Sequence, residues 1–283
     1  MQETVQRVRP LDALRMSEQL DVATSHLKTG IHAMVITLNE ERNIAECLAS
    51  VAWANEIVVV DACSTDRTVE LARRFTDKIF VRPWPGYGPQ KNFGIEQVTA
   101  DWILIVDADE RVSPELQVEI RKIISLPHNN EISAYRVPRR NYYYGRWVRW
   151  GGVYPDYQIR LFRKGCARYN DVQIHENLLV KGSISTLVGH LDHFTERQIE
   201  DHFRKFGTYT TLAAQEKLKQ IKSVGWSDLL IRPLVITFKT YFIKQGLRDG
   251  VHGLIMSVFA GMFTFVKYSK AWDLLRRKAE AGG

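Results

Sequence analysis

Cysteine is scarce in this sequence: only Cys47, Cys63 and Cys166 occur among 283 residues. Their spacing matches no zinc motif and an odd number cannot pair completely, which argues against a disulfide-stapled secreted scaffold. Residues 1–29 carry many charges and lack the apolar core of a signal peptide. We therefore expect a reducing compartment, most simply the cytosol, and a polar N-terminal extension.

Two phosphate-binding motifs are also absent. The sequence contains neither a GxxxxGK[ST] P-loop nor a GxGxxG fingerprint, so ATPase and dinucleotide-cofactor functions lose their usual support. What is present is an ordinary globular composition, 45% hydrophobic and 25% charged. The formal net charge of +7 favours anionic partners, which include nucleotides, phosphorylated glycans, nucleic acid and acidic membrane surfaces.

From residue 31 onward, apolar runs typical of buried strands alternate with helical patterns. The expected strands span residues 31–38, 56–61, 78–82 and 101–106. The expected helices span residues 40–53, 64–75 and 88–98, and a fourth begins at Ser113 and Pro114, a capping hydroxyl followed by a proline suited to the first turn. This alternation predicts an α/β fold, with a mostly parallel central sheet covered by helices on both faces.

After residue 130 the sequence becomes aromatic and basic. Alternation near YQIRLFR, residues 157–163, predicts strands. Thr195 and Gln198 form a capping-box pattern that opens a long helix ending near Gln220. From Asp228 the chain turns apolar again.

Three polar segments follow strands of the predicted sheet: TLNEE after the first, Asp61 after the second, and DAD, residues 107–109, after the fourth. Ligands of open parallel sheets bind beyond the carboxyl ends of the strands. Alone, two aspartates one residue apart are compatible with a structural turn. At this edge, however, their oxygens suit Mg²⁺ or Mn²⁺ holding a diphosphate, whose negative charge the ion would neutralise.

Residues 33–112 resemble family 2 glycosyltransferases of the glycosyltransferase-A fold. The likeness lies in VITLNEERNIAECLASV, EIVVVDACSTDRTVELA, GPQKNFGI and WILIVDADE, which agree in order and spacing. Cys63 stands where the family usually has a small residue such as glycine, and we expect no functional consequence. The resemblance implies a Rossmann-like catalytic domain at 30–225, with a nucleotide-sugar half at 30–130 and an acceptor half at 131–225. A helical C-terminal region at 226–283 follows.

The resemblance also implies a donor site. The nucleoside pocket would be lined by Thr37, Leu38, Asn39 and Glu40. Asp61 would accept a hydrogen bond from the base, expected to be uracil; the alternative is a turn or helix cap.

The donor phosphates and a metal ion would lie beside the DAD segment. Lys91 would approach the phosphates, unless it is only a solvated lysine. By resemblance, Asp107 would approach the ribose and the metal, Asp109 would be the principal metal ligand, and Ala108 between them would contact the donor. The implied cofactor is Mg²⁺ or Mn²⁺.

Inverting transfer also needs a general base that deprotonates the acceptor hydroxyl. Many relatives use the acid of an ED motif beyond the metal motif, which this chain lacks; Glu176 in NDVQIHENL and Asp156 in YPDYQIR are the candidates. Residues 157–182 resemble the lipopolysaccharide inner-core β-glucosyltransferases, in which HE occupies the place of that acid. We predict Glu176 as base, with Asp156 next; the alternative for Glu176 is a strand-end carboxylate paired with an arginine.

Arginines and aromatic residues crowd the stretch from 136 to 163. Such a mixture can bind single-stranded nucleic acid or a phosphorylated glycan, or it can be a solvated basic face. The nucleotide-sugar motifs favour the glycan, with Arg160, His175 and His193 as acceptor or phosphate contacts. His190 and His193 lack a third metal ligand, so we expect a hydrogen-bonded structural pair, although HFT in the resembling subgroup leaves a substrate contact for His193 open.

The C-terminal region contains 17 uncharged residues at 250–266, the low edge for a membrane span. Upstream, one helical face carries Ile231, Leu234, Val235, Phe238 and Phe242. The accompanying positive charges are Arg232, Lys239, Lys244 and Arg248. This combination predicts a helix lying on an anionic membrane surface; a core-packing helix pair and a true span are the alternatives.

Together these patterns predict an inverting, metal-dependent glycosyltransferase at the inner face of the cytoplasmic membrane. It would move a hexose, glucose from UDP-glucose, to a lipid-linked glycan such as lipopolysaccharide inner core, forming a β-linkage. The rival hypotheses are a polyprenyl-phosphate hexosyltransferase and a non-catalytic sugar-nucleotide or glycan-binding scaffold. We do not expect nucleic acid as a partner.

Overall fold

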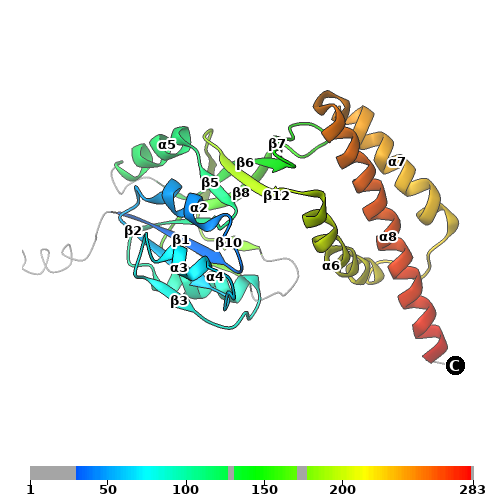
Figure 1. The fold of residues 1–283 in the computed structure, drawn as a ribbon, viewed down its shortest axis with the longest axis horizontal. Helices are drawn as coiled ribbons and strands as arrows, with labels where there is room; N and C mark the ends of the chain where they lie inside the picture. The colour runs from blue at the N-terminus through cyan, green and yellow to red at the C-terminus, as the bar shows by residue number, and fades with distance from the viewer. Residues whose placement is uncertain (1–29, 127–130, 171–176, 282–283) are drawn as a thin grey trace, which may run out of the picture.

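The computed structural model describes residues 30–126, 131–170 and 177–281. In this part of the chain, ten strands form one sheet in the order β3-β2-β1-β4-β8-β6-β12-β5, with β7 and β11 paired to β6 (Figure 1). The strands are β1 (Ile31–Thr37), β2 (Glu56–Asp61), β3 (Ile79–Val81), β4 (Trp102–Asp107), β5 (Glu110–Val112), β6 (Ile132–Tyr143), β7 (Arg146–Trp147), β8 (Asp156–Arg163), β11 (Ser183–Thr186) and β12 (Leu191–Glu196). Outside this sheet, β9 (Ala167–Tyr169) pairs with β10 (Leu178–Val180).

The sheet has a parallel half and a mixed half. Strands β3, β2, β1 and β4 run parallel, whereas β8 pairs antiparallel with β4 and β6. Strands β1, β2 and β4 are nearly continuous apolar runs because both faces of this half are covered. The predicted α/β fold with a largely parallel central sheet is confirmed, and the antiparallel pairs belong to the aromatic and basic stretch.

Helices pack on both faces of the sheet. The core on one face includes residues of α2 (Ile44–Val51), α3 (Thr68–Ala72) and α5 (Pro114–Ile124). On the other face, side chains of α4 (Tyr87–Gln97) pack against the second core. The predicted start of α5 is confirmed, since the Ser113 hydroxyl accepts a hydrogen bond of 3.2 Å from the Leu116 backbone.

The helix α6 (Ile199–Leu218) begins at a different cap from the one predicted. Gln198 is the N-cap, and the Asp201 side chain accepts the Gln198 backbone N–H at 3.2 Å, which completes a capping box. Thr195 lies within β12 instead. The predicted box between Thr195 and Gln198 is therefore wrong, because the strand continues through Glu196 and moves the helix start along the chain.

The C-terminal region forms a helical hairpin beside the sheet (Figure 1). Its elements are η1 (Ser227–Ile231), α7 (Arg232–Phe238), η2 (Lys239–Ile243), η3 (Gly246–Asp249) and α8 (Val251–Ala281). Helix α8 packs against α7 and α6. By length and composition alone, the segment from 251 to 280 is able to cross a membrane, because an 18-residue window of it has a mean hydropathy of 1.3, although core helices of soluble proteins pass the same test.

Candidate active site

The carboxyl ends of β1, β2 and β4 meet at one edge of the sheet. The parallel register sets Thr37 opposite Asp61 and Ile36 opposite Asp107. Thr37 is buried and its hydroxyl has no hydrogen-bond partner in the described part of the chain, whereas the neighbouring Leu38 is 46% exposed. The edge thus offers a polar group and an accessible apolar side chain side by side.

The loop after β1 is tied to the loop after β2. Asn39 has a φ of 53°, and its side-chain oxygen accepts a hydrogen bond of 2.8 Å from the Thr65 backbone. Asp61 accepts hydrogen bonds from the Ser64 backbone at 2.8 Å and from the Ser64 hydroxyl at 2.5 Å. Asp61 therefore holds the turn after β2, and its contact with a base stays a prediction.

Asp107 lies in a buried cluster of alternating charge. Lys91 Nζ is 3.6 Å from Asp107 Oδ1, and Arg160 donates to the other oxygen of Asp107 and, at 2.6 Å, to Glu110. Arg139 donates to the same Glu110 oxygen at 3.2 Å. Lys91 is only 5% exposed, so it is not a solvated surface lysine.

This cluster stays ionised because its charges compensate one another. Burial alone would raise the pKa of Asp107, but the positive charges of Arg160 and Lys91 outweigh it and hold that pKa well below its usual range. Burial would likewise lower the pKa of Arg160, but Asp107 and Glu110 keep it well above its ordinary value. Arg160, predicted as an acceptor contact, is thus committed to two carboxylates that it holds in place.

Asp109 faces a different partner, His193 on β12. The Nε2 atom of His193 lies 3.3 Å from Asp109 Oδ2, and its Nδ1 atom lies 2.7 Å from the side-chain oxygen of Asn141. Burial would raise the pKa of Asp109, but the hydrogen bond and charge of His193 lower it. For His193, burial would lower the pKa, but the bond and charge of Asp109 raise it.

Asp109 and His193 provide a suitable pair of ligands for a divalent cation. A carboxylate and an imidazole nitrogen face each other, while Asn141 fixes the far side of the ring, as is usual for metal-ligating histidines. No group of three His, Cys, Asp or Glu residues able to hold an ion occurs within residues 30–126, 131–170 and 177–281. Two protein ligands suffice for Mg²⁺ when phosphate oxygens and water complete its coordination.

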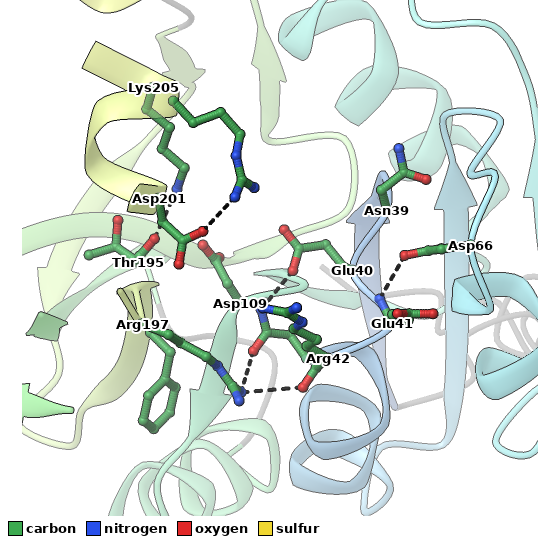
Figure 2. A pocket seen from close by; sticks show the side chains of 13 residues that line it. Asn39, Glu40, Glu41, Arg42, Asp66, Asp109, Thr195, Arg197, Asp201 and Lys205 are labelled. Atoms are coloured by element: carbon green, nitrogen blue, oxygen red, sulfur yellow. Dashed lines mark hydrogen bonds and ion pairs between the residues drawn. The ribbon is translucent and has the colours of Figure 1, made fainter. Parts of the chain in front are cut away.

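A hollow of about 230 Å³ opens beside this pair, between the loop after β1 and the start of α6 (Figure 2). Carboxylates of Glu40 and Asp109 lie on one side of it. Arg197 donates to Asn43 at 2.6 Å, and Lys205 donates to the Thr195 carbonyl at 2.9 Å. Both cations line the hollow, as do Arg42, Arg204 and five acidic residues, so cations and carboxylates are mixed around it.

Burial in this hollow perturbs the carboxyl group of Glu40. Burial raises its pKa above the ordinary value, a hydrogen bond from Asn43 opposes that rise, and the nearby charge of Asp109 adds to it. A cation between Glu40 and Asp109 would relieve their repulsion.

Asp107 lines a second hollow, of about 410 Å³, together with Lys91, Arg139 and Arg160. The two aspartates of the DAD segment therefore line different hollows, although only one residue separates them in the sequence. Ala108 between them is buried, at 4% exposure.

Asp156 is occupied by other side chains. Its Oδ2 atom accepts two hydrogen bonds from Arg139, at 2.9 and 2.6 Å, and one from Asn141 at 3.2 Å. Burial would raise the pKa of Asp156, but Arg139 and these hydrogen bonds lower it. A carboxylate so held is a weak base. The other predicted base, Glu176, and His175 lie outside the described residues.

The predicted structural pair of His190 and His193 is wrong. His190 hydrogen-bonds the Tyr154 hydroxyl at 2.9 Å and stacks on its ring, whereas His193 meets Asp109. Side chains three residues apart on or beside a strand point to opposite faces of the sheet. The two imidazole rings therefore have different partners. Asn141, Arg197 and Lys205 were not predicted from the sequence. For Arg197, the available signal was the segment HFTER, residues 193–197.

Known proteins resemble this chain over most of its length. Residues 33–178 match the model of the family described as glycosyl transferase family 2. The lipopolysaccharide core biosynthesis glycosyltransferase LpsC of Rhizobium meliloti is 30% identical over 259 residues, which covers 89% of this chain and 95% of LpsC. An uncharacterized glycosyltransferase of Rickettsia typhi is 30% identical over 254 residues, 86% of this chain and 87% of that protein.

Among solved structures, S. aureus TarS 1-349 in complex with UDP-GlcNAc aligns over 88% of this chain and 92% of that one, with 14% identity and a TM-score of 0.43. The family match and the 30% identity to LpsC over nearly its whole length show which family this chain belongs to. This chain belongs to glycosyl transferase family 2 and is a glycosyltransferase.

Proposed function

We propose that the protein is an inverting, divalent-metal-dependent hexosyltransferase that uses UDP-glucose and modifies a lipid-linked, phosphorylated glycan of the lipopolysaccharide core type. The observation that carries this proposal is the meeting of Asp109 and His193 beside a hollow lined by Arg197 and Lys205. A pair that fits a divalent cation, next to cationic side chains, suits a nucleoside diphosphate. The name of the Rhizobium relative supports the acceptor class.

The donor lies across the edge of the sheet. Thr37, Leu38 and Asn39 line the nucleoside end, and Asp61 holds the turn that borders it. Asp109 and His193 would hold the ion, which would supply positive charge to the leaving diphosphate. Arg197 and Lys205 contribute further positive charge on the far side of the hollow.

The acceptor oxygen attacks the anomeric carbon while the bond from that carbon to the UDP oxygen breaks. Glu176 takes the proton of the acceptor hydroxyl, and the configuration inverts in the single displacement. Asp156 is the weaker candidate because Arg139 and Asn141 occupy its oxygens and its pKa is lowered. Asp107 stays fixed by Arg160 and borders the second hollow, which we assign to the acceptor side.

A polyprenyl-phosphate hexosyltransferase is the main alternative within the family. Its acceptor is already an anion and needs little base catalysis, so Glu176→Gln separates the two enzymes. A non-catalytic scaffold would bind the sugar nucleotide without turnover.

The protein also attaches to the membrane surface through its C-terminal helices. Leu234, Val235, Phe238 and Phe242 are more than half exposed on or beside α7, and basic residues accompany them. Apolar side chains with flanking lysines and arginines are the pattern of a helix at an anionic lipid interface. Attachment would bring a lipid-linked acceptor to the catalytic domain.

The test measures UDP release from a panel of UDP-sugars with Mg²⁺ or Mn²⁺, with and without a lipid-linked core acceptor. We expect one donor to support metal- and acceptor-dependent release, which Asp109→Ala and Glu176→Gln abolish. Asp101→Asn is the matched control, because Asp101 directly precedes β4 at the opposite end of the strand from the site. UDP binding without turnover on any acceptor would favour the scaffold, and turnover that survives Glu176→Gln would favour the phosphate acceptor.

A further inference from the structure

An apolar cavity lies where the helical hairpin meets the catalytic domain. It measures about 340 Å³, near the lower end of the range of ligand pockets. The loop after β7 contributes Val148, Trp150 and Val153, and the hairpin contributes Ile236, Met256 and Ala260. The cavity is separate from both hollows at the sheet edge, which share no lining residue with it.

The walls of this cavity are locked together across a long separation in sequence. Asp249, only 5% exposed, accepts backbone hydrogen bonds from Arg149 at 3.1 Å and Trp150 at 2.7 Å. The Gly151 N–H also donates to the Lys244 carbonyl at 2.8 Å. A buried carboxylate that satisfies two backbone donors makes this junction a built part of the fold.

Positive charge without a carboxylate partner gathers at the mouth. Lys239 and Lys244 line the cavity, and the guanidinium groups of Arg149 and Arg248 lie 5.5 and 4.4 Å from the centre of the Trp150 ring. These four side chains are exposed, and none forms an ion pair with a carboxylate of the residues described.

An apolar interior behind a cationic mouth selects an amphiphile whose anionic group adjoins a hydrocarbon chain. Burial of a chain supplies affinity through the hydrophobic effect, and the lysines and arginines are matched in charge to a phosphate. The exposed apolar side chains of α7, including Leu234 and Phe238, lie on the helix that also supplies Ile236 to the cavity wall. Ile236 lies about half a turn from Leu234 and Phe238, so the cavity wall and the exposed apolar side chains are on opposite sides of α7.

We propose that this cavity binds one hydrocarbon chain of a phosphorylated lipid, with Lys239 and Lys244 beside the phosphate. The assignment rests on the proposed function in naming that lipid as the anchor of the glycan acceptor. The loop that forms one wall leads into β8, and Arg160 of β8 holds Asp107. A chain held here would place its head group next to the strand that runs to the second hollow.

Lipid binding is tested directly on the full chain in detergent, without donor, by titration with dioleoyl phosphatidic acid. Dioleoylglycerol serves as the probe without phosphate. We expect saturable one-to-one binding of phosphatidic acid, weakened at least about tenfold by Ala260→Phe, which fills the cavity. Val258→Phe is the matched control, because Val258 lies on α8 outside the cavity and is 40% exposed.

A second pair of variants tests the mouth without perturbing the core. The double substitution Lys239→Gln and Lys244→Gln should weaken phosphatidic acid binding about tenfold, with no change for dioleoylglycerol. The double substitution Lys222→Gln and Lys278→Gln, at exposed lysines elsewhere in the C-terminal third of the chain, should have no effect.

The proposal is overturned if Ala260→Phe and Val258→Phe weaken binding equally, or if neither does. It is also overturned if Ala260→Phe instead dissociates an oligomer of the chain, since the cavity would then be an interface between copies. UDP release by the same variants on a lipid-free core glycan should equal that of the wild type. Absence of UDP release in the wild type would count against the proposed function alone, because the lipid titration uses neither donor nor metal.

Discussion

Apolar side chains are usually buried and charged ones exposed. The edge of the catalytic sheet and the C-terminal hairpin depart from this pattern in opposite ways. At the sheet edge, Arg160 and Glu110 are charged yet buried, and each is compensated by the other and by Asp107 or Arg139. In the hairpin, large apolar side chains are exposed, and the cations at the cavity mouth form no ion pair with an acidic residue in the part of the chain that the structure describes. In the first region, buried charges are held in a fixed arrangement at a cost in stability. In the second, the surface is free to bind a partner that is both apolar and anionic.

The sharpest test of this contrast replaces one arginine in each region. Arg160→Met should lower the free energy of unfolding by about 3–5 kcal/mol, because it leaves Glu110 buried without its main partner. Arg232→Met removes an exposed pair with Asp228 and should change that energy by less than about 1 kcal/mol. Urea denaturation of both variants measures the difference; equal effects would contradict a compensated buried cluster.

Within the catalytic region, the two histidines on either side of Leu191 and Asp192 should separate metal binding from packing. His193→Gln should raise the Mg²⁺ or Mn²⁺ concentration for half-maximal UDP release by at least about 10–100-fold, because losing an outer partner of a metal ligand already costs that much and His193 is itself a proposed ligand. His190→Gln should leave that concentration unchanged, because His190 packs on Tyr154 instead. Indistinguishable metal titrations for the two variants would remove His193 from the proposed ion site.

On the hairpin, the exposed face should control membrane binding and leave folding unaffected. The double substitution Leu234→Ser and Phe238→Ser should reduce partitioning to anionic vesicles by about 30–900-fold, since each apolar side chain contributes of order 1–2 kcal/mol when buried in lipid. The free energy of unfolding should change by about 0.5 kcal/mol or less per site. Vesicle sedimentation and denaturation provide the two readings; a loss of stability with unchanged partitioning would indicate core packing.

Asp156 offers a test that depends on pH. Its pKa is lowered in the folded chain, so its contribution to stability is complete above the unfolded value of about 3.9 and is lost as pH falls through the lower folded value. Asp156→Asn should therefore cost about 1–2 kcal/mol at pH 7 and progressively less toward pH 3. If Glu176 is the base, kcat/KM at neutral pH should fall by less than about tenfold; a loss above about a hundredfold would transfer that role to Asp156.

The smallest expected effect concerns Cys63, whose φ of 63° lies in the left-handed region. A side chain there costs about 1–2 kcal/mol, part of which is offset because glycine loses more entropy on folding. Cys63→Gly should therefore stabilise the fold by about 0.5 kcal/mol and leave UDP release unchanged. Thermal unfolding of the variant measures the gain, and a lower melting temperature would indicate that the thiol makes a contact of value.

Local patterns accounted for much of the fold. The alternation of apolar strands with helices, the cap at Ser113 and the order of the strand-end motifs are written in short stretches of sequence. The start of α6 was misplaced because a capping-box pattern cannot reveal that β12 continues through Glu196. The helical hairpin was visible as an apolar and basic pattern, but its cavity was not.

The parallel half of the sheet and the aspartates at its edge were predictable from the sequence alone, because the apolar patterns of strands and helices extend over neighbouring residues. Only the tertiary structure decided which partner each aspartate meets. Asp107 joins Lys91 and Arg160, whereas Asp109 joins His193 of β12, although one residue separates the two. Contacts between segments so far apart in the chain leave no local periodicity, and they arise only when the strands of the mixed half pair beside the parallel half.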